Sequence, residues 1–210
     1  MENRVSVDKL TNKGTSELPI YYYKQILFSG IIYDADIDGT VYLEEAIKDG
    51  YKNGIEKRWY ENGQLSAEFS YKDGKWDGLS KQWDENGQIK KEENYKEGKL
   101  DGVYKVWYEN GQLQYEENYK DGKADGLWAD WFENGQLKSE WNYKDGYKNG
   151  IEKRWYKNGQ LSAEFSYKDG KWDGLHREWY ESGQLKKRGK FKDGNLINQK
   201  KHDENVVLIE

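Results

Sequence analysis

The residues best suited to metal chemistry lie in one short acidic segment. It has the pattern D-x-D-x-D-G-x5-E, and its oxygen ligands would be Asp34, Asp36, Asp38 and Glu45. Carboxylates at alternate positions, a glycine at the sharp turn and a distal glutamate suit Ca²⁺. However, residues 31–32 and 42–43 have the apolar character of strands, whereas an EF-hand loop lies between helices. The segment therefore predicts either a calcium loop or a plain hairpin turn, and the sequence suggests no other cofactor.

Residues for covalent or acid–base catalysis are scarce. Cysteine is absent, which excludes zinc–thiolate sites and cysteine nucleophiles, and the only histidines are His176 and His202. His176 takes a strand position that Glu56, Ser80 and Glu152 fill in other copies of a repeat, so we expect it on a solvated face. The carboxylates recur at equivalent turn positions, whereas acid–base catalysis needs two carboxylates in different environments. The sequence therefore predicts no catalytic residue and no enzymatic activity.

Aromatic side chains recur at one position of the repeated unit. The tryptophans of this column are Trp59, Trp83, Trp107, Trp131, Trp155 and Trp179. Cross-strand aromatic packing stabilises sheets, which favours a structural role for a column present in nearly every copy. The alternative is a stacking platform for a sugar or a peptide. The formal net charge of the chain is only −5, and acidic neighbours flank its lysines, so we expect no nucleic-acid binding.

Two adjacent central copies differ from the others on the face opposite the tryptophan column. Most copies carry polar side chains at three alternate positions of the first strand, for example Ser80, Gln82 and Asp84. The two central copies place larger apolar side chains there, namely Tyr104, Val106, Tyr108, Trp128 and Phe132. Aromatic side chains with a polar surround are typical of a hot spot for protein binding. Internal packing of this face and neutral divergence of the repeats are the alternatives.

All these residues except His202 belong to a repeat of 24 residues. Glycines recur at three fixed positions of the unit, and seven copies run from Gly30 to Ile197. Within a copy, side chains alternate in character on either side of Glu85-Asn86-Gly87, which predicts two strands joined by a three-residue turn. Residues 51–79 and 147–175 differ only at Glu61 and Lys157, as expected from a recent internal duplication.

One such hairpin buries too little apolar surface to fold alone, so its stability must come from neighbouring copies. We therefore predict an all-β fold, an elongated single antiparallel sheet (a meander) built of seven 24-residue β-hairpin repeats at residues 30–197. Residues 1–29 are predicted to form an N-terminal cap with one or two strands, because caps protect open sheet edges. Residues 198–210 are predicted to be a C-terminal tail or an edge strand, according to whether the run Val206–Ile209 pairs.

The hydropathy of the chain bears on its compartment. No apolar run reaches the roughly 18 residues that suggest a transmembrane helix, and residues 1–10 lack the apolar core of a signal peptide. The sequence as printed predicts a cytoplasmic protein, and a secreted or periplasmic one if its N-terminus has been trimmed.

The repeated motif resembles a known family. Residues 83–89 and 95–102 are similar to the bacterial MORN-repeat variant, and the chain resembles the YwqK-like, antitoxin-type group of such proteins. The resemblance implies an elongated array of β-hairpins that acts as an interaction scaffold, and phospholipid binding has been proposed for the wider family. The first copy departs from the motif, because Ala35 replaces the tryptophan and Ile47 the tyrosine, and this is typical of a capping repeat.

Taken with the lack of catalytic residues, these features predict a non-enzymatic scaffold that binds another protein. A surface or secreted carbohydrate-binding module that uses the tryptophan column is the first alternative. An antitoxin or immunity protein that neutralises a toxin by direct binding is the second, and only the resemblance implies it.

Overall fold

A computed structural model describes residues 3–16 and 18–201. The described residues contain β-strands, turns and one 3-10 turn, η1 (Val7–Lys9), and no α-helix. The main sheet is large, open and mixed, with 19 strands, and a second sheet has three. The chain divides into two units, residues 1–104 (unit 1) and residues 105–210 (unit 2). The predicted all-β fold is therefore confirmed.

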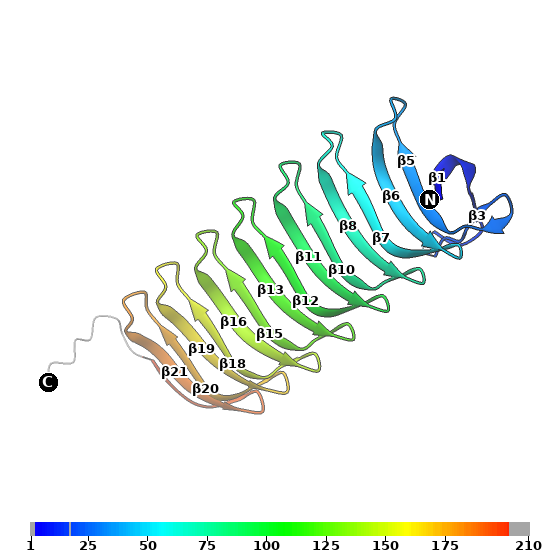
Figure 1. Cartoon of the computed structure of the whole chain (residues 1–210). Helices are drawn as coiled ribbons and strands as arrows, with labels where there is room; N and C mark the ends of the chain where they lie inside the picture. The colour runs from blue at the N-terminus through cyan, green and yellow to red at the C-terminus, as the bar shows by residue number, and fades with distance from the viewer. Residues whose placement is uncertain (1–2, 17, 202–210) are drawn as a thin grey trace. The chain divides into compact units, whose positions relative to one another are not determined.

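Unit 1 begins with short strands and continues as a meander (Figure 1). Its strands are β1 (Arg4–Ser6), β2 (Thr11–Asn12), β3 (Tyr21–Tyr23), β4 (Ile26–Leu27), β5 (Gly30–Ala35), β6 (Val41–Lys48), β7 (Tyr51–Trp59), β8 (Leu65–Lys72), β9 (Lys75–Trp76), β10 (Gly78–Trp83) and β11 (Ile89–Lys96). Strand β12 (Lys99–Trp107) runs across the boundary between the units.

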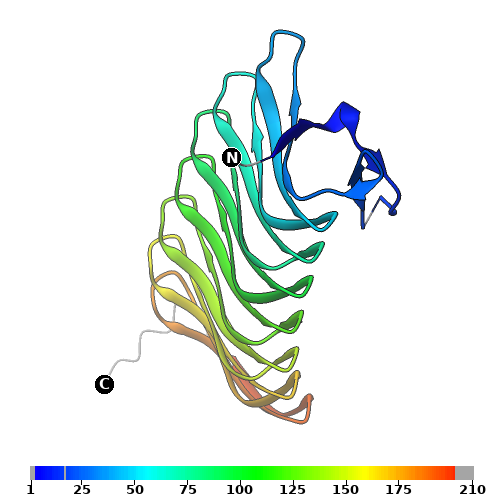
Figure 2. The same cartoon turned by 45° about the vertical axis from the view of Figure 1, so that its right-hand side comes forward.

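Unit 2 repeats the same hairpin (Figure 2). Its strands are β13 (Leu113–Lys120), β14 (Lys123–Ala124), β15 (Gly126–Trp131), β16 (Leu137–Lys144), β17 (Tyr147–Lys148), β18 (Gly150–Trp155), β19 (Leu161–Lys168), β20 (Lys171–Trp179), β21 (Leu185–Lys192) and β22 (Asn195–Lys201). Strand β22 pairs with β21 through Lys201, so the chain after residue 197 continues as a strand. The predicted edge strand at Val206–Ile209 lies outside the described residues.

Two kinds of turn shape every hairpin. In the turn at Glu85-Asn86-Gly87, Asp84 N donates to Gln88 O at 2.9 Å and Gly87 N donates to Asp84 O at 3.0 Å, which confirms the predicted three-residue turn. At the other end, Asp73 and Gly74 form a two-residue turn with φ of 49° and 78°. Positive φ at both positions defines a type I′ turn, whose twist matches that of paired strands.

The N-terminal segment closes the first repeat of unit 1. It supplies four short strands and η1, where the sequence predicted one or two strands. Phe28 forms an apolar cluster with Ile32 and Ile47, and Tyr21 and Tyr23 pack against it. Strand β1 pairs in parallel with β5, with Arg4 opposite Ile31. The sheet is therefore mixed and not purely antiparallel, because β1 reaches β5 by a connection that includes the small sheet β2–β3–β4.

The two faces of each hairpin differ in burial. We call the packed face the one that carries Glu56 in unit 1 and Glu152 in unit 2. Their side chains and those of Ser80 and His176, on the same face, are at most 6% exposed. The opposite face presents apolar side chains to solvent, among them Ile55, Leu79, Ile151 and Leu175. The prediction of a solvated face at these positions of the first strand is therefore wrong, because ion pairs and aromatic rings cover them.

Candidate functional site: a groove on the packed face

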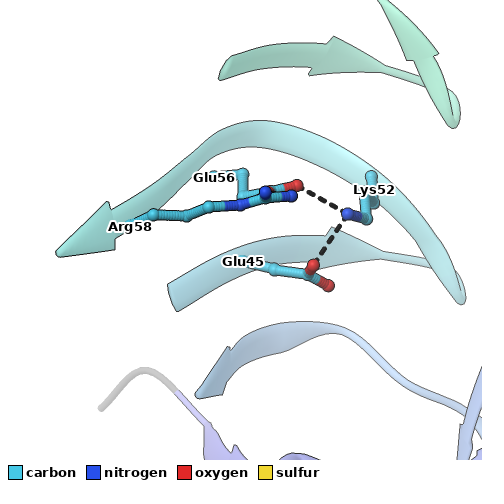
Figure 3. A network of polar contacts seen from close by, with 4 residues as sticks. All are labelled: Glu45, Lys52, Glu56 and Arg58. Atoms are coloured by element: carbon cyan, nitrogen blue, oxygen red, sulfur yellow. Dashed lines mark hydrogen bonds and ion pairs between the residues drawn. The ribbon is translucent and has the colours of Figure 1, made fainter. Parts of the chain in front are cut away.

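A network of charged side chains lies on the packed face of unit 1 (Figure 3). Nζ of Lys52 lies 2.7 Å from Oε1 of Glu45 and 2.6 Å from Oε2 of Glu56. Nε of Arg58 donates to the other oxygen of Glu56 at 2.7 Å. Two basic and two acidic side chains are thus joined, and the network is balanced in charge.

The electrostatics of this network follow from its burial. Burial alone would lower the pKa of Lys52, but Glu45 and Glu56 outweigh it, so the pKa lies above its ordinary value. Tyr21, from the N-terminal segment, approaches Glu45, and burial together with that carboxylate raises the pKa of Tyr21 to about 12. Backbone N–H of Tyr21 donates to Gly50 O at 2.8 Å. The N-terminal segment therefore packs beside the network in unit 1.

Unit 2 carries a related network with one carboxylate fewer. Nζ of Lys148 lies 2.7 Å from Oε2 of Glu152, and Nε of Arg154 donates to Oε1 of Glu152 at 2.6 Å. Trp141 takes the position that corresponds to Glu45, and Nζ of Lys148 lies 4.6 Å from the centre of the Trp141 ring. Burial would raise the pKa of Glu152, but hydrogen bonds from Lys148 and Arg154 hold it below its ordinary value.

This second network borders an open groove of about 470 Å³ in unit 2. Phe132 and Trp141 supply apolar lining, and Lys148, Glu152 and Arg154 supply charge. Asp130 also lines the groove, and it accepts a hydrogen bond from Oγ of Ser139 at 3.0 Å. Apolar lining with a few placed charges is typical of a binding groove.

The residues of the predicted hot spot are distributed over the two units. Tyr104, in unit 1, is half-buried, and Nζ of Lys91 lies 5.0 Å from the centre of its ring. Val106, in unit 2, is also half-buried, and the hydroxyl of Tyr108 donates to Trp131 O at 2.8 Å. Phe132 lines the groove described above.

Trp128, the fifth of these residues, lies inside an aromatic cluster. The centre of its ring is 4.7 Å from that of Tyr143, 5.4 Å from Tyr119 and 6.1 Å from Trp141. Its indole N–H donates to Asn118 O at 3.1 Å. These contacts favour internal packing as the role of Trp128, while the hot spot as a whole stays a prediction.

The tryptophan column is half-buried along its length. Its members Trp59, Trp83, Trp107, Trp131, Trp155 and Trp179 have intermediate exposure. Carbonyl oxygens of three of them accept hydrogen bonds from tyrosine hydroxyls: Tyr60 donates to Trp83 and Tyr156 to Trp179, both at 2.7 Å, and Tyr108 donates to Trp131. The backbone of the column thus links neighbouring hairpins within each unit, and its role as a structural column or a sugar platform stays a prediction.

His176 lies in a box of aromatic rings. The centre of its ring is 4.2 Å from Phe191, stacked, and 4.6 Å from Trp172, edge to face. Burial lowers the pKa of His176, and its Nε2 lies 3.3 Å from Ser166 O. The imidazole therefore fills a packing position. His202 lies outside the described residues.

The acidic segment forms the turn between β5 and β6. Oδ1 of Asp34 accepts from the backbone N–H of Ala35 at 3.0 Å, and Oδ1 of Asp38 accepts from Thr40 at 2.9 Å. Glu45 lies along β6 with its carboxylate on Lys52. Among residues 3–16 and 18–201, no group of three or more histidine, aspartate or glutamate side chains is arranged to hold a metal ion. Calcium binding by Asp34, Asp36, Asp38 and Glu45 stays a prediction.

Hairpins of fixed length, most of them joined by Asn-Gly and Asp-Gly turns, define a β-hairpin repeat protein. A family model for the MORN repeat variant matches residues 52–73, 76–97, 100–121, 124–145, 148–169 and 172–193. The chain belongs to this family, whose repeats are commonly non-catalytic scaffolds that bind proteins or membranes. No curated protein gave a significant match. Within the described residues, no helix is long and apolar enough to cross a membrane.

The alternation of polar and apolar residues in the sequence does not predict the groove or its charged network. Lys148 and Glu152 are four residues apart, a spacing that places them far from each other in a straight strand. The available signal was Gly150 between them, because a glycine inside a strand marks a bend or a bulge.

Proposed function

We propose that the protein is a non-enzymatic scaffold that binds another protein through the groove of unit 2. The observation that supports this proposal is the combination in one open groove of two aromatic side chains, Phe132 and Trp141, with the partly exposed basic groups of Lys148 and Arg154. Aromatic residues and arginine are enriched in protein–protein interfaces.

Two narrower functions fit within or beside this proposal. An antitoxin or immunity role in a bacterium, as implied by the resemblance to the YwqK-like group, would make a toxin the bound protein. A carbohydrate-binding role would instead use the tryptophan column, and a glycan array would detect it. Absence of catalysis is part of the proposal, in line with the general character of the family.

Affinity capture from the source organism, followed by mass spectrometry, tests the scaffold. The groove variant is Phe132→Asp, which places in unit 2 the aspartate that unit 1 has at the corresponding position 36. The control is Ile151→Ser, since Ile151 is 52% exposed on the opposite face. We expect one protein to be captured by wild type and by the control, and to be lost with Phe132→Asp. Equal capture of the partner by wild type and by Phe132→Asp overturns the proposal, and so does a failure of wild type to capture any specific protein.

A further inference from the structure

The internal duplication provides a comparison of two nearly identical surfaces. Residues 51–79 of unit 1 recur as residues 147–175 of unit 2 with one difference, Lys157 in place of Glu61. Differences in the environment of the two copies therefore come mainly from the strands that flank them. The groove of unit 2 lies where the second copy meets strands β15 and β16.

The lysine of the network pairs with two carboxylates in unit 1 and with one in unit 2. In unit 1, Nζ of Lys52 contacts two carboxylates, and its side chain is 15% exposed. In unit 2, Nζ of Lys148 pairs with one carboxylate among the described residues, that of Glu152, and otherwise faces the rings of Trp141 and Tyr167; its side chain is 26% exposed. Glu152 is also shared with Arg154. One carboxylate thus serves two cations in unit 2, whereas two carboxylates serve two cations in unit 1.

At three corresponding positions, unit 2 lacks a negative charge that unit 1 has, and at one of them it has a positive charge instead. Relative to unit 1, unit 2 has Phe132 for Asp36, Trp141 for Glu45 and Lys157 for Glu61. Nζ of Lys157 lies 6.0 Å from the centre of the Phe132 ring, beside the groove. The groove is lined by three basic and two acidic side chains in a chain whose formal net charge is −5. Its local charge is therefore opposite in sign to that of the whole chain.

The basic groups of the groove are partly exposed, whereas its carboxylates already have hydrogen-bond partners. The side chains of Lys148 and Arg154, which line the groove, are 26% and 52% exposed. The carboxylates of Glu152 and Asp130 already accept hydrogen bonds from Lys148, Arg154 and Ser139. An occupant that brings acceptor oxygens and negative charge suits this arrangement best.

We propose that the groove of unit 2 binds an aspartate or glutamate side chain of a protein partner, whose carboxylate pairs with Lys148 as that of Glu45 pairs with Lys52. This inference rests on the proposed scaffold function and names the chemistry of its partner. Unit 1 provides the precedent, since a carboxylate approaches the corresponding lysine at 2.7 Å. A doubly charged phosphate is less suitable, because it would also face the carboxylates of Glu152 and Asp130.

A fluorescently labelled acidic peptide, five repeats of Glu-Gly, tests the inference, with five repeats of Gln-Gly as its uncharged counterpart. Binding is measured by fluorescence anisotropy at low salt, where ion pairs are least screened. We expect wild type to bind the glutamate peptide and not the glutamine peptide. Lys148→Met should weaken binding by at least about tenfold, because it removes the group that pairs with the carboxylate. Lys153→Met, which removes a lysine that pairs with Glu140 on the opposite face, should change affinity less than about twofold.

Two further variants separate a specific site from general attraction. Trp141→Glu supplies the carboxylate internally, as in unit 1, and should abolish peptide binding. The double variant Glu61→Lys/Lys157→Glu keeps the net charge at −5 and exchanges two exposed residues that the two copies already accommodate. We expect it to weaken binding by about threefold or more, as loss of a charge beside an interface does. Circular dichroism checks the folding of each variant, and the exposed double variant keeps the test valid if Trp141→Glu does not fold.

Several results would overturn the inference. They are equal binding of the two peptides by wild type, equal losses in Lys148→Met and Lys153→Met, and an unchanged affinity in the double variant. Binding to phosphatidylinositol phosphate vesicles that depends on Lys148, without peptide binding, would assign the groove to a membrane surface instead. If the peptide fails while Phe132→Asp still abolishes partner capture, the scaffold stands and only the carboxylate inference falls.

Discussion

Lys52 and Glu56 are four residues apart in strand β7, yet Nζ of Lys52 lies 2.6 Å from Oε2 of Glu56. In a straight strand these residues would be about 13 Å apart, since each residue advances about 3.3 Å. The strand bends at Gly54, whose φ is 116°, and in Figure 3 the ribbon of β7 arches over the side chains that meet beneath it. The same bend at Gly150, with φ of 94°, brings Lys148 to Glu152 in unit 2.

Replacing the glycine at the bend with alanine should lower the free energy of unfolding by different amounts in the two copies. A Cβ at Gly54 would lie 2.9 Å from Cβ of Ala46, whereas one at Gly150 would have no neighbour within 4 Å. Gly150→Ala should therefore cost only the backbone strain, about 1–2 kcal/mol in the free energy of unfolding. Gly54→Ala should cost about 2–4 kcal/mol, because steric overlap adds to the strain. Urea denaturation of both variants measures the difference, and equal midpoints would contradict this account.

The loss of stability at low pH should depend in part on Glu152. Its pKa is lower in the folded chain than the ordinary value of 4.5, so its contribution is present above pH 4.5 and is lost as the pH falls through the folded pKa. Glu152→Gln should lower the melting temperature at pH 7 and reduce its further decline below pH 4.5. The matched control is Glu164→Gln, which removes a more exposed carboxylate that lies 3.7 Å from Arg177. Parallel pH profiles for wild type and Glu152→Gln would rule out this role.

The hairpin array could be predicted because its determinants are local. Glu85-Asn86-Gly87 and Asp73-Gly74 specify their turns by residue type, and turns with a glycine at the same position recur in every copy at the same spacing, although Ser182 and Glu97 replace the asparagine and the aspartate in two of them. The mixed character of the sheet could not be predicted in this way. It depends on β1 reaching β5 after the three short strands of the small sheet, and no local pattern encodes that pairing.

The packed face could not be predicted from alternation either. Glu56, Ser80, Glu152 and His176 are the residue types expected at a solvated surface, and they are all buried. Glu56 is covered by Lys52 and Arg58, and His176 by Trp172 and Phe191. These contacts depend on the bend in the strand and on register between hairpins, which a count of polar and apolar positions does not include.

Calcium should have little effect on stability if Glu45 keeps its partner. Chelation at the turn between β5 and β6 would require the Glu45 carboxylate to leave Lys52, which it contacts at 2.7 Å. We therefore expect no change in melting temperature at millimolar Ca²⁺. A calcium-dependent rise that Asp36→Ala abolishes would instead establish the site, since ligand binding to the folded state stabilises it by mass action.

Trp128 should matter for stability more than its place in a predicted binding patch suggests. Three aromatic rings surround its side chain, and its indole N–H donates to Asn118 O. Trp128→Ala should therefore lower the free energy of unfolding by about 3 kcal/mol, through a cavity and a lost hydrogen bond. Leu127→Ala is the control, because Leu127 is 42% exposed on the opposite face of the same strand, and exposed substitutions usually change stability by less than about 0.5 kcal/mol. Thermal and urea denaturation compare the two variants with wild type. A Trp128→Ala variant as stable as wild type, with weakened binding to a captured partner, would instead support the surface hot spot.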